Sequence, residues 1–377
     1  MIDTVVLVLL ASSFQITDPT LFSPYVKTYP QFSSSGFVKC VQNPTIYDKR
    51  NDIYKPCLTH TVRIVGNTIR TTLAIQFSVP KLLYLNNLDE VTDKSFDLVL
   101  ETLHQTLVQM GVSVHPTSLR LAPVSIVHYS KNIVLPIHIT ASMIMTQLAK
   151  IDVPKTFSMD STRYKNAGNG IDMYSKSFEI VFYDKIKDLA KGSKVHFDQE
   201  PTHYQQSLFE TYTTPQNPIS ILRLEVRIKS KQKLVQILKK CGQSSSPFFT
   251  NIFSEKISQA VLQNIWQQLV TGKNLAVLGW NHAIDLEIVA QNIPLTPQRL
   301  LSAYGAVQFA QTGGMRKLRA IMENRGSDRS WQRIKSDVEL ITSTAKVAQP
   351  SWVQHIYRAL SQFEPYRTPK QNEQDHI

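Results

Sequence analysis

A tyrosine at the predicted junction between a strand and a helix is the first chemical feature of this sequence. Tyr183 closes an alternating strand over residues 177–183, and Asp184 is placed to cap the short helix that follows. Lys187, one helical turn later, can return to the side of the phenol. A tyrosine nucleophile needs a nearby cation, because the ordinary phenol pKa of about 10 leaves little phenolate at neutral pH. A core tyrosine beside a solvated lysine has the same spacing.

A row of charges lies on the strand predicted over residues 219–228. Arg223, Glu225 and Arg227 alternate along it and therefore share one face, while apolar residues occupy the other face. Such a row can bind DNA phosphates through its arginines and a divalent cation through its carboxylate. The same row is typical of a solvated face on which opposite charges pair.

The elements that must position these residues are of two kinds. In the first part of the chain, strand-like and helix-like segments alternate, with a hairpin that turns at Gly66. Further on, the apolar spacing is helical throughout. We therefore predict an α+β domain over residues 1–230, with a mainly antiparallel central sheet flanked by helices. An all-helical domain over residues 231–365 and a disordered tail over residues 366–377 complete the prediction.

The charge balance favours a polyanionic partner. The chain has 377 residues, with 41 Lys and Arg against 29 Asp and Glu, and a net charge of +12. Nucleic acid is the commonest partner of so basic a protein, although a basic surface without a specialised role has the same composition.

A basic cluster in the predicted helical domain sharpens this expectation. Within twenty residues, and interleaved with Trp331, the sequence places Arg316, Lys317, Arg319, Arg325, Arg329, Arg333 and Lys335. A basic helix pair with an aromatic residue suits duplex or single-strand binding. It is also compatible with a solvated face over an apolar core, and both descriptions can hold together.

Cysteine use and hydropathy indicate a cytoplasmic protein with no membrane partner. Three scattered cysteines without CxxC spacing suit a reducing compartment. The apolar run over residues 5–10 lacks a cationic start and is short for a signal sequence, so we predict a buried first strand there. No stretch approaches the roughly 18 apolar residues of a membrane helix.

Five short blocks follow one another along the chain. They are Met1-Ile-Asp-Thr-Val-Val-Leu7, Ser78-Val-Pro-Lys-Leu-Leu83 with Asn86-Asn87, Ser161-Thr-Arg163 followed by Val181-Phe-Tyr-Asp-Lys185, the strand over residues 222–229, and Arg329-Ser-Trp-Gln-Arg333. In order and approximate spacing these blocks resemble the filamentous-phage gene II replication proteins, which initiate rolling-circle replication. The strand over residues 222–229 is similar to the Phe-Glu-Ala-Arg-Ile-Lys strand of that family.

The resemblance implies a site-specific DNA nickase and strand transferase. Tyr183 would be the nucleophile, assisted by Lys187, and would leave a 5′-phosphotyrosine link and a 3′-OH primer before the strand is rejoined. Origin DNA, single- and double-stranded, would be the substrate, with the host replicative helicase and polymerase as further partners. The residues expected to contact DNA are Arg163, Arg223, Arg227, Arg316, Arg329 and Arg333.

Nickases of this kind need a divalent metal, Mg²⁺ or Mn²⁺, to polarise the scissile phosphate. The wider class of rolling-circle nucleases presents a His-hydrophobic-His triplet, and this sequence has none. We predict His128 and Glu225 as the metal ligands, with Gln76 as a weaker candidate. His138 is expected to be structural.

Two other classes of protein share some of these features. A non-catalytic origin-binding protein would keep the basic surfaces without cleaving DNA. A tyrosine recombinase is disfavoured, because those enzymes surround the phosphate with several Arg and His on a largely helical domain, whereas Tyr183 follows a strand.

Overall fold

A single antiparallel sheet organises the protein. The computed structural model describes residues 1–32, 36–153, 158–160, 170–189, 219–243, 246–270, 274–278, 286–323, 325–344 and 350–368. The sheet has nine strands, in the spatial order β3 (Phe37–Gln42), β4 (Cys57–Val65), β5 (Thr68–Ser78), β1 (Ile2–Leu10), β7 (Val124–Val134), β11 (Ile221–Ile228), β10 (Phe178–Asp184), β9 (Gly170–Ser175) and β8 (Ser158–Asp160). Every described pairing within it is antiparallel. The predicted α+β class is confirmed, and the strand predicted over residues 219–228 lies near the middle of the sheet.

The two faces of the sheet differ in chemistry because its strands alternate apolar and polar residues. One face carries the buried core, including Leu7 of β1, Val127 of β7 and Leu224 of β11. Four helices contact the central or neighbouring strands and cover that core: α5 (Ala141–Leu148), α8 (Lys231–Lys240), α10 (Glu255–Val270) and α16 (Ser351–Gln362). The opposite face carries the polar residues of the candidate site.

Shorter elements complete this part of the chain. They are α1 (Ile46–Arg50), α2 (Val79–Tyr84), α3 (Phe96–Gln109), α4 (Pro116–Arg120), α6 (Lys185–Leu189), α9 (Phe249–Ile252), a small sheet of β2 (Phe14–Ile16) and β6 (Val112–Val114), and the 3₁₀ turns η1 (Ala11–Ser13), η2 (Pro19–Leu21) and η3 (Asp93–Ser95). The end of α4 leads almost directly into β7, with three residues between them. Pro116, at the first position of α4, has the fixed φ that suits a helix start.

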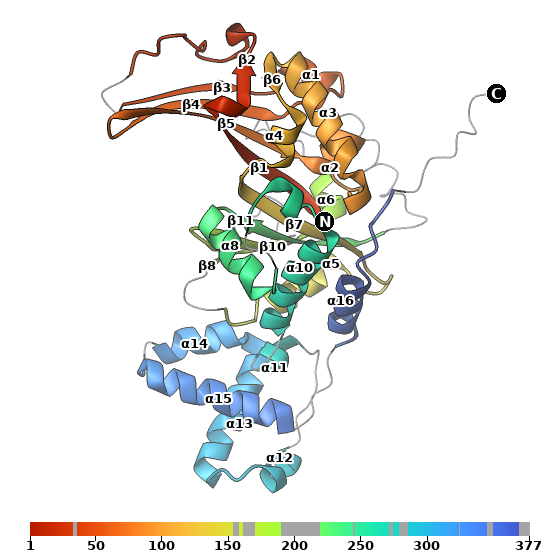
Figure 1. Cartoon of the computed structure of the whole chain (residues 1–377). Helices are drawn as coiled ribbons and strands as arrows, with labels where there is room; N and C mark the ends of the chain where they lie inside the picture. Colours follow the sequence, from red (N-terminus) through yellow and green to blue (C-terminus); the bar gives the residue numbers. More distant parts are fainter. Residues whose placement is uncertain are drawn as a thin grey trace, which may run out of the picture.

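Every described element after β11 is a helix, as predicted, but these helices belong to two bodies (Figure 1). The helices α8, α10 and α16 pack on the sheet, and α9 joins them through the contact of Phe249 with Phe77. The remainder form a second group, here called the helical arm: α11 (Leu275–Leu278), α12 (Leu286–Asn292), α13 (Pro297–Gly313), α14 (Met315–Glu323) and α15 (Asp328–Thr344). The arm contacts the sheet unit through the ion pair of Arg319 with the buried Asp152 at 2.9 Å. The sheet unit thus extends past the expected boundary at residue 230, because the apolar faces of α8 and α10 are buried on the sheet.

The helical arm is an insertion between two helices that run antiparallel to each other. The Gln259 and Gln263 amides of α10 donate to the carbonyl of Leu360 near the end of α16. Trp266, late in α10, meets Trp352 at the start of α16 edge to face, with 6.2 Å between ring centroids. The chain therefore leaves and re-enters the sheet unit at the same end of this helix pair.

After α16 the chain returns to the sheet as residues 363–368, here called the C-terminal strap. The Glu90 carboxylate accepts a hydrogen bond from the Tyr366 amide at 2.9 Å and from the Lys131 ammonium at 2.6 Å. The Thr368 amide donates to Asp89 at 2.6 Å. The tail predicted to be disordered from residue 366 is thus held as far as residue 368, and the rest of it lies outside the described residues. No helix among the described residues is long and apolar enough to cross a membrane.

Candidate active site

The polar face of the central strands gathers the residues predicted to do chemistry. Along β7 and β11, His128 lies opposite Arg227, and Ser130 lies opposite Glu225. On the next strand, Tyr183 lies opposite Arg223. Directly opposed residues of an antiparallel pair project from the same face, so the alternation seen in the sequence places all of these side chains on one side.

A β-bulge adds a carboxylate that the sequence did not reveal. Strand β1 pairs with β7 through Ile2 opposite Tyr129 and Thr4 opposite His128, which leaves Asp3 as an extra residue. A bulge re-aims the side chain that it carries. The Asp3 carboxylate points to the polar face, where it lies 2.6 Å from the Arg223 guanidinium. The one available signal was an acidic residue in an otherwise apolar strand.

Asp3, His128 and Glu225 form a group suited to a metal ion. Each offers one ligand atom, and these atoms all lie within 4.8 Å of one another. His128 Nδ1 is 3.2 Å from Glu225 Oε1. Two carboxylates with one imidazole fit Mn²⁺ better than Mg²⁺, which prefers oxygen ligands alone. Gln76 lies one strand further on the same face, opposite Val6, and is exposed.

Tyr183 joins this group through its hydroxyl, which donates to Glu225 Oε2 at 3.3 Å. The Glu225 carboxylate therefore lies between the phenol and the imidazole of His128. The three residues singled out from the sequence converge on one point of the polar face, although they come from three different strands.

The pKa values of Tyr183 and Glu225 shift in opposite directions. Burial raises the pKa of Tyr183 well above its ordinary value, and the nearby Arg223 opposes that shift only in part. Burial would also raise the pKa of Glu225, but Arg227 and His128 hold it well below the usual range. Glu225 is therefore ionised at neutral pH, whereas Tyr183 is a phenol until further positive charge arrives.

The lysine beside the Tyr183 ring is Lys185. Its ammonium lies 5.7 Å from the ring centroid and donates to Asn87 Oδ1 at 2.8 Å. It is fully buried, and burial lowers its pKa to about 8. Asp184 caps α6 as predicted, accepting a hydrogen bond from the Lys187 amide, and the exposed Lys187 ammonium lies 3.9 Å from Asp184. The sequence reasoning missed Lys185, because its burial depends on the neighbouring Asn87 loop.

The two arginines of β11 are components of the site and do not form a solvated basic row. Arg223 is 1% exposed and donates to the carbonyl of Asn87 at 2.6 Å and to Ser130 at 2.9 Å, besides its pair with Asp3. Arg223, which the sequence led us to expect at the DNA, is enclosed by these partners. Arg227 remains partly exposed and pairs with Glu225 at 3.1 Å.

Comparison with protein-family models, curated proteins and solved structures finds no match for this chain. A fold by itself does not define an activity, so function has to be inferred from the chemistry of the site.

The remaining predicted residues lie apart from this group. Arg316 on α14, and Arg329 and Arg333 on α15, are exposed on the helical arm, and their guanidinium groups have no partner among the described residues. Arg163 lies outside the described residues. His138 is exposed in the loop after β7.

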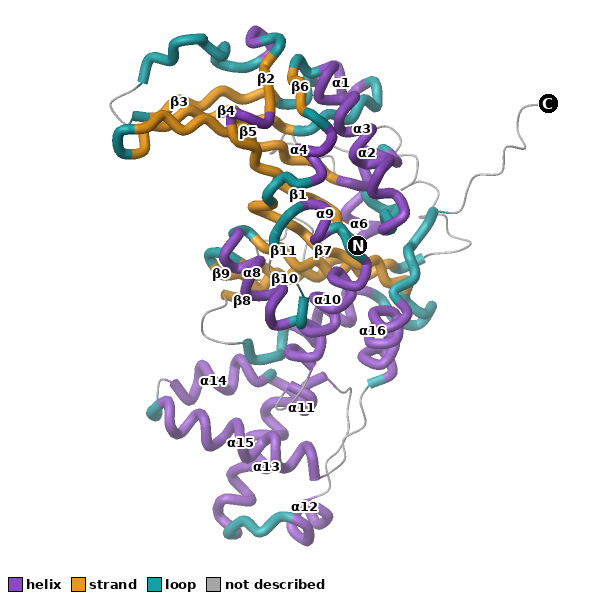
Figure 2. Tube along the Cα trace, viewed as in Figure 1, coloured by secondary structure: helices purple, strands orange, loops and turns teal. Residues whose placement is uncertain are grey.

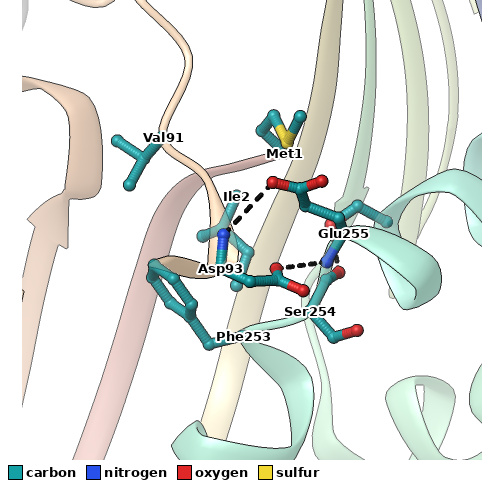
Figure 3. Close-up of a pocket in the computed structure, with 8 residues that line it drawn as sticks. Met1, Ile2, Val91, Asp93, Phe253, Ser254 and Glu255 are labelled. Carbon is teal, nitrogen blue, oxygen red and sulfur yellow. Dashed lines mark hydrogen bonds between the residues drawn. The ribbon is translucent and has the colours of Figure 1, made fainter. Parts of the chain in front are cut away.

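A small hollow near the start of β1 is not a second reactive site (Figure 3). Its two carboxylates are engaged with backbone amides: the Asp93 amide donates to Glu255 at 3.2 Å, and the Glu255 amide donates to Asp93 at 2.5 Å. The other lining residues are apolar or serine, so no imidazole, thiol or lysine side chain faces this hollow.

Proposed function

We propose that this protein is a metal-dependent DNA nickase and strand transferase in which Tyr183 is the nucleophile. The observation that carries the proposal is the contact of the Tyr183 hydroxyl with Glu225, within a cluster that also contains Asp3 and His128. A nucleophile beside a set of potential metal ligands is the arrangement that phosphoryl transfer requires.

The chemistry would proceed in balanced steps. The Tyr183 hydroxyl loses its proton along the hydrogen bond to Glu225 and on to solvent, and its oxygen bonds to the phosphorus. The bond between phosphorus and the 3′ oxygen breaks, and that oxygen takes up a proton to give a free 3′-OH. Rejoining is the reverse: the 3′-OH attacks the phosphotyrosine and releases the phenol.

The residues around Tyr183 would have separate tasks. A divalent cation held by Asp3, His128 and Glu225 would supply positive charge to the scissile phosphate and to the attacking oxygen. Arg223 fixes the position of Asp3, and Arg227 fixes that of Glu225. Lys185 keeps a positive charge at the Tyr183 ring. Together these charges oppose the effect of burial, which holds the phenol in its protonated form.

The proposed substrate is origin DNA, and the setting would be the cytoplasm, where a host polymerase can extend the 3′-OH and a helicase can unwind the strand ahead of it. The exposed arginines of the helical arm would bind the duplex near the nick. These partners follow from the chemistry of the product, since a 3′-OH is a primer.

A covalent-capture experiment tests the proposal without knowledge of the origin sequence. A pool of random single-stranded oligonucleotides is incubated with the protein and Mn²⁺ or Mg²⁺, and DNA that survives denaturing washes is sequenced. We expect adducts that depend on metal, with the modified peptide containing Tyr183. Tyr174, on β9 and on the same face of the sheet, provides a matched control when changed to Phe. Metal-independent binding without any adduct would favour a non-catalytic origin-binding protein.

A further inference from the structure

The β4–β5 hairpin projects beyond the helices that cover the sheet (Figures 1 and 2). Its two strands pair without interruption from Cys57 opposite Gln76 to Val65 opposite Thr68. The turn consists of Gly66 and Asn67, and Gly66 has the positive φ of 60° that the first residue of a type II′ turn requires. The projecting end, residues 63–70, is here called the hairpin tip.

One face of the hairpin tip is basic. Arg63 and Arg70 lie directly opposite each other, an arrangement that destabilises an isolated hairpin. Both are exposed, and the Arg63 guanidinium lies 5.0 Å from the ring centroid of Phe37 on β3. Lys39 lies on the same face, because Phe37 pairs with Arg63 and Lys39 pairs with Thr61. Residues 19–47 and 53–88 contain no Asp or Glu, so the sequence of this hairpin and its neighbouring strand offers no carboxylate to these cations.

The other face of the hairpin tip is apolar and exposed. Ile64 and Ile69 form a cross-strand pair with 49% and 65% of their surfaces in contact with solvent. Val65, at the turn, is 52% exposed. Exposed apolar pairs at the end of long strands invite aggregation, so natural proteins usually cover or charge them. Cations on the opposite face indicate that the occupant is a polyanion.

We propose that the hairpin tip is a wedge for duplex DNA: Ile64 and Ile69 enter between base steps, and Arg63 and Arg70 hold the flanking phosphates. Apolar side chains inserted in this way unstack a duplex and kink it. This inference rests on the proposed function, since a nickase with a partly buried nucleophile needs a locally opened strand.

The distance along the sheet fits that task. From Arg70 to Ser78, which pairs with Thr4 beside Asp3, the strand advances eight residues, or about 26 Å at roughly 3.3 Å per residue. Glu225 lies three strands further across the sheet, or about 14 Å at roughly 4.8 Å per strand. The combined distance is about 30 Å, so at roughly 3.4 Å per base step the wedge would open the duplex about nine base pairs from the nick.

The test compares duplex opening with single-strand cleavage. An origin recovered by covalent capture is made as a duplex, and opening is read from the permanganate reactivity of its thymines in a Tyr183→Phe background, so that no cleavage intervenes. The Ile64→Thr/Ile69→Thr variant keeps β-branched residues in the strands. We expect this variant to lower the permanganate reactivity of the thymines about tenfold. With Tyr183 restored, the same variant should nick single-stranded oligonucleotides within twofold of the wild-type rate. Ile137→Thr, at an exposed apolar residue in the loop after β7, serves as the matched control.

A second variant separates the charges from the wedge. Arg63→Gln/Arg70→Gln should weaken duplex binding and lower the slope of log affinity against log salt by up to about two. Wild-type opening by the isoleucine variant would overturn the inference. Absence of any adduct on single-stranded DNA would instead defeat the proposed function, because that reaction does not need the hairpin.

Discussion

The candidate active site and one surface of the helical arm carry their charges in opposite ways, although Arg299 and Arg319 of the arm are themselves paired with Asp337 and Asp152. At the site, Asp3, Glu225 and Arg223 are buried, and each charge meets an opposite charge within hydrogen-bonding distance. On the arm, Arg329 and Arg333 stand exposed without partners among the described residues. Paired, buried charges hold a fixed geometry, and the protein loses much of its stability when one partner of such a pair is removed. Exposed cations can exchange one phosphate for another, and the affinity that they contribute falls steeply as the salt concentration rises.

The difference in charge pairing suits the two regions to different roles. The proposed chemistry at phosphorus needs atoms held within fractions of an ångström, and the strands of the sheet unit suit that need. The proposed binding of a long polyanion needs many weak, replaceable contacts, and the exposed arginines of the arm suit that need. Changes at the site should therefore act on rate and stability, and changes on the arm should act on affinity and its salt dependence.

The largest effect is expected for Tyr183→Phe. It removes only a hydroxyl, so the fold and DNA affinity should persist, while nicking and adduct formation should fall by at least about 10³-fold because the bond-forming atom is gone. Denaturing gels with end-labelled DNA measure both quantities. Tyr174→Phe should leave them unchanged. A labelled peptide that contains another tyrosine would show that the nucleophile lies elsewhere.

Removal of the bulge carboxylate should affect both metal use and stability. Asp3→Asn leaves Arg223 buried without its counter-charge, which should lower the free energy of unfolding by about 3 kcal/mol. The metal concentration for half-maximal nicking should rise about 100-fold, as expected when a ligand is lost. The matched variant His128→Gln should raise the metal requirement with little change in urea unfolding, because His128 is partly exposed. Equal metal requirements for Asp3→Asn and wild type would exclude Asp3 as a ligand.

Lys185 should make stability depend on pH in the alkaline range. Its pKa falls from 10.5 to about 8 on folding, so between these values the unfolded chain holds more protons than the folded protein. The free energy of unfolding should therefore rise with pH from about 8 to 10.5, by at most about 3 kcal/mol. Urea denaturation across this range measures the slope, and Lys185→Met should flatten it. Lys187→Met, two residues further along α6 and exposed, should keep the wild-type slope.

The smallest effect is expected on the arm. Arg329→Ala/Arg333→Ala should lower the slope of log affinity against log salt by up to about two, since each arginine can release one counterion from DNA. The rate of nicking on saturating single-stranded DNA should not change. Arg358→Ala, at an exposed arginine on α16, is the control outside the arm. A slope unaltered by the double variant would mean that this surface does not touch DNA.

Local periodicity was sufficient to predict the strands of the site and the Asp184 cap. It also placed Glu225 and Tyr183 on sheet faces where they could meet, because alternation defines the face once two strands pair. The bulge at Asp3 could not be predicted, because an acidic residue in a mostly apolar strand was its one signal and does not show that the pairing register shifts there. The burial of Arg223 was also missed, because an alternating polar row has the same pattern whether solvent or another loop covers it.

The packing of the helices after residue 230 was the other feature that the sequence did not reveal, although it led us to predict a boundary there. Amphipathic helices such as α8 and α10 show that one face is buried, but not against which surface. The return of α16 and the C-terminal strap to the sheet depends on contacts between residues about 100 to 280 positions apart, such as Gln259 with Leu360 and Glu90 with Tyr366. No local signal encodes such a separation.

Because α10 and α16 pair antiparallel, the helical arm is an insertion whose two ends lie close together. Because the chain leaves the sheet unit after Val270 and returns at Pro350 on the same end of the helix pair, a short linker can join these residues without disturbing either helix. The shortened protein should remain folded and, with its strap intact, nick single-stranded oligonucleotides; failure to fold would show that the arm is part of the core. If the proposed function holds, such a junction would let a lineage replace the arm, and with it the means of finding DNA, while inheriting the reaction unchanged.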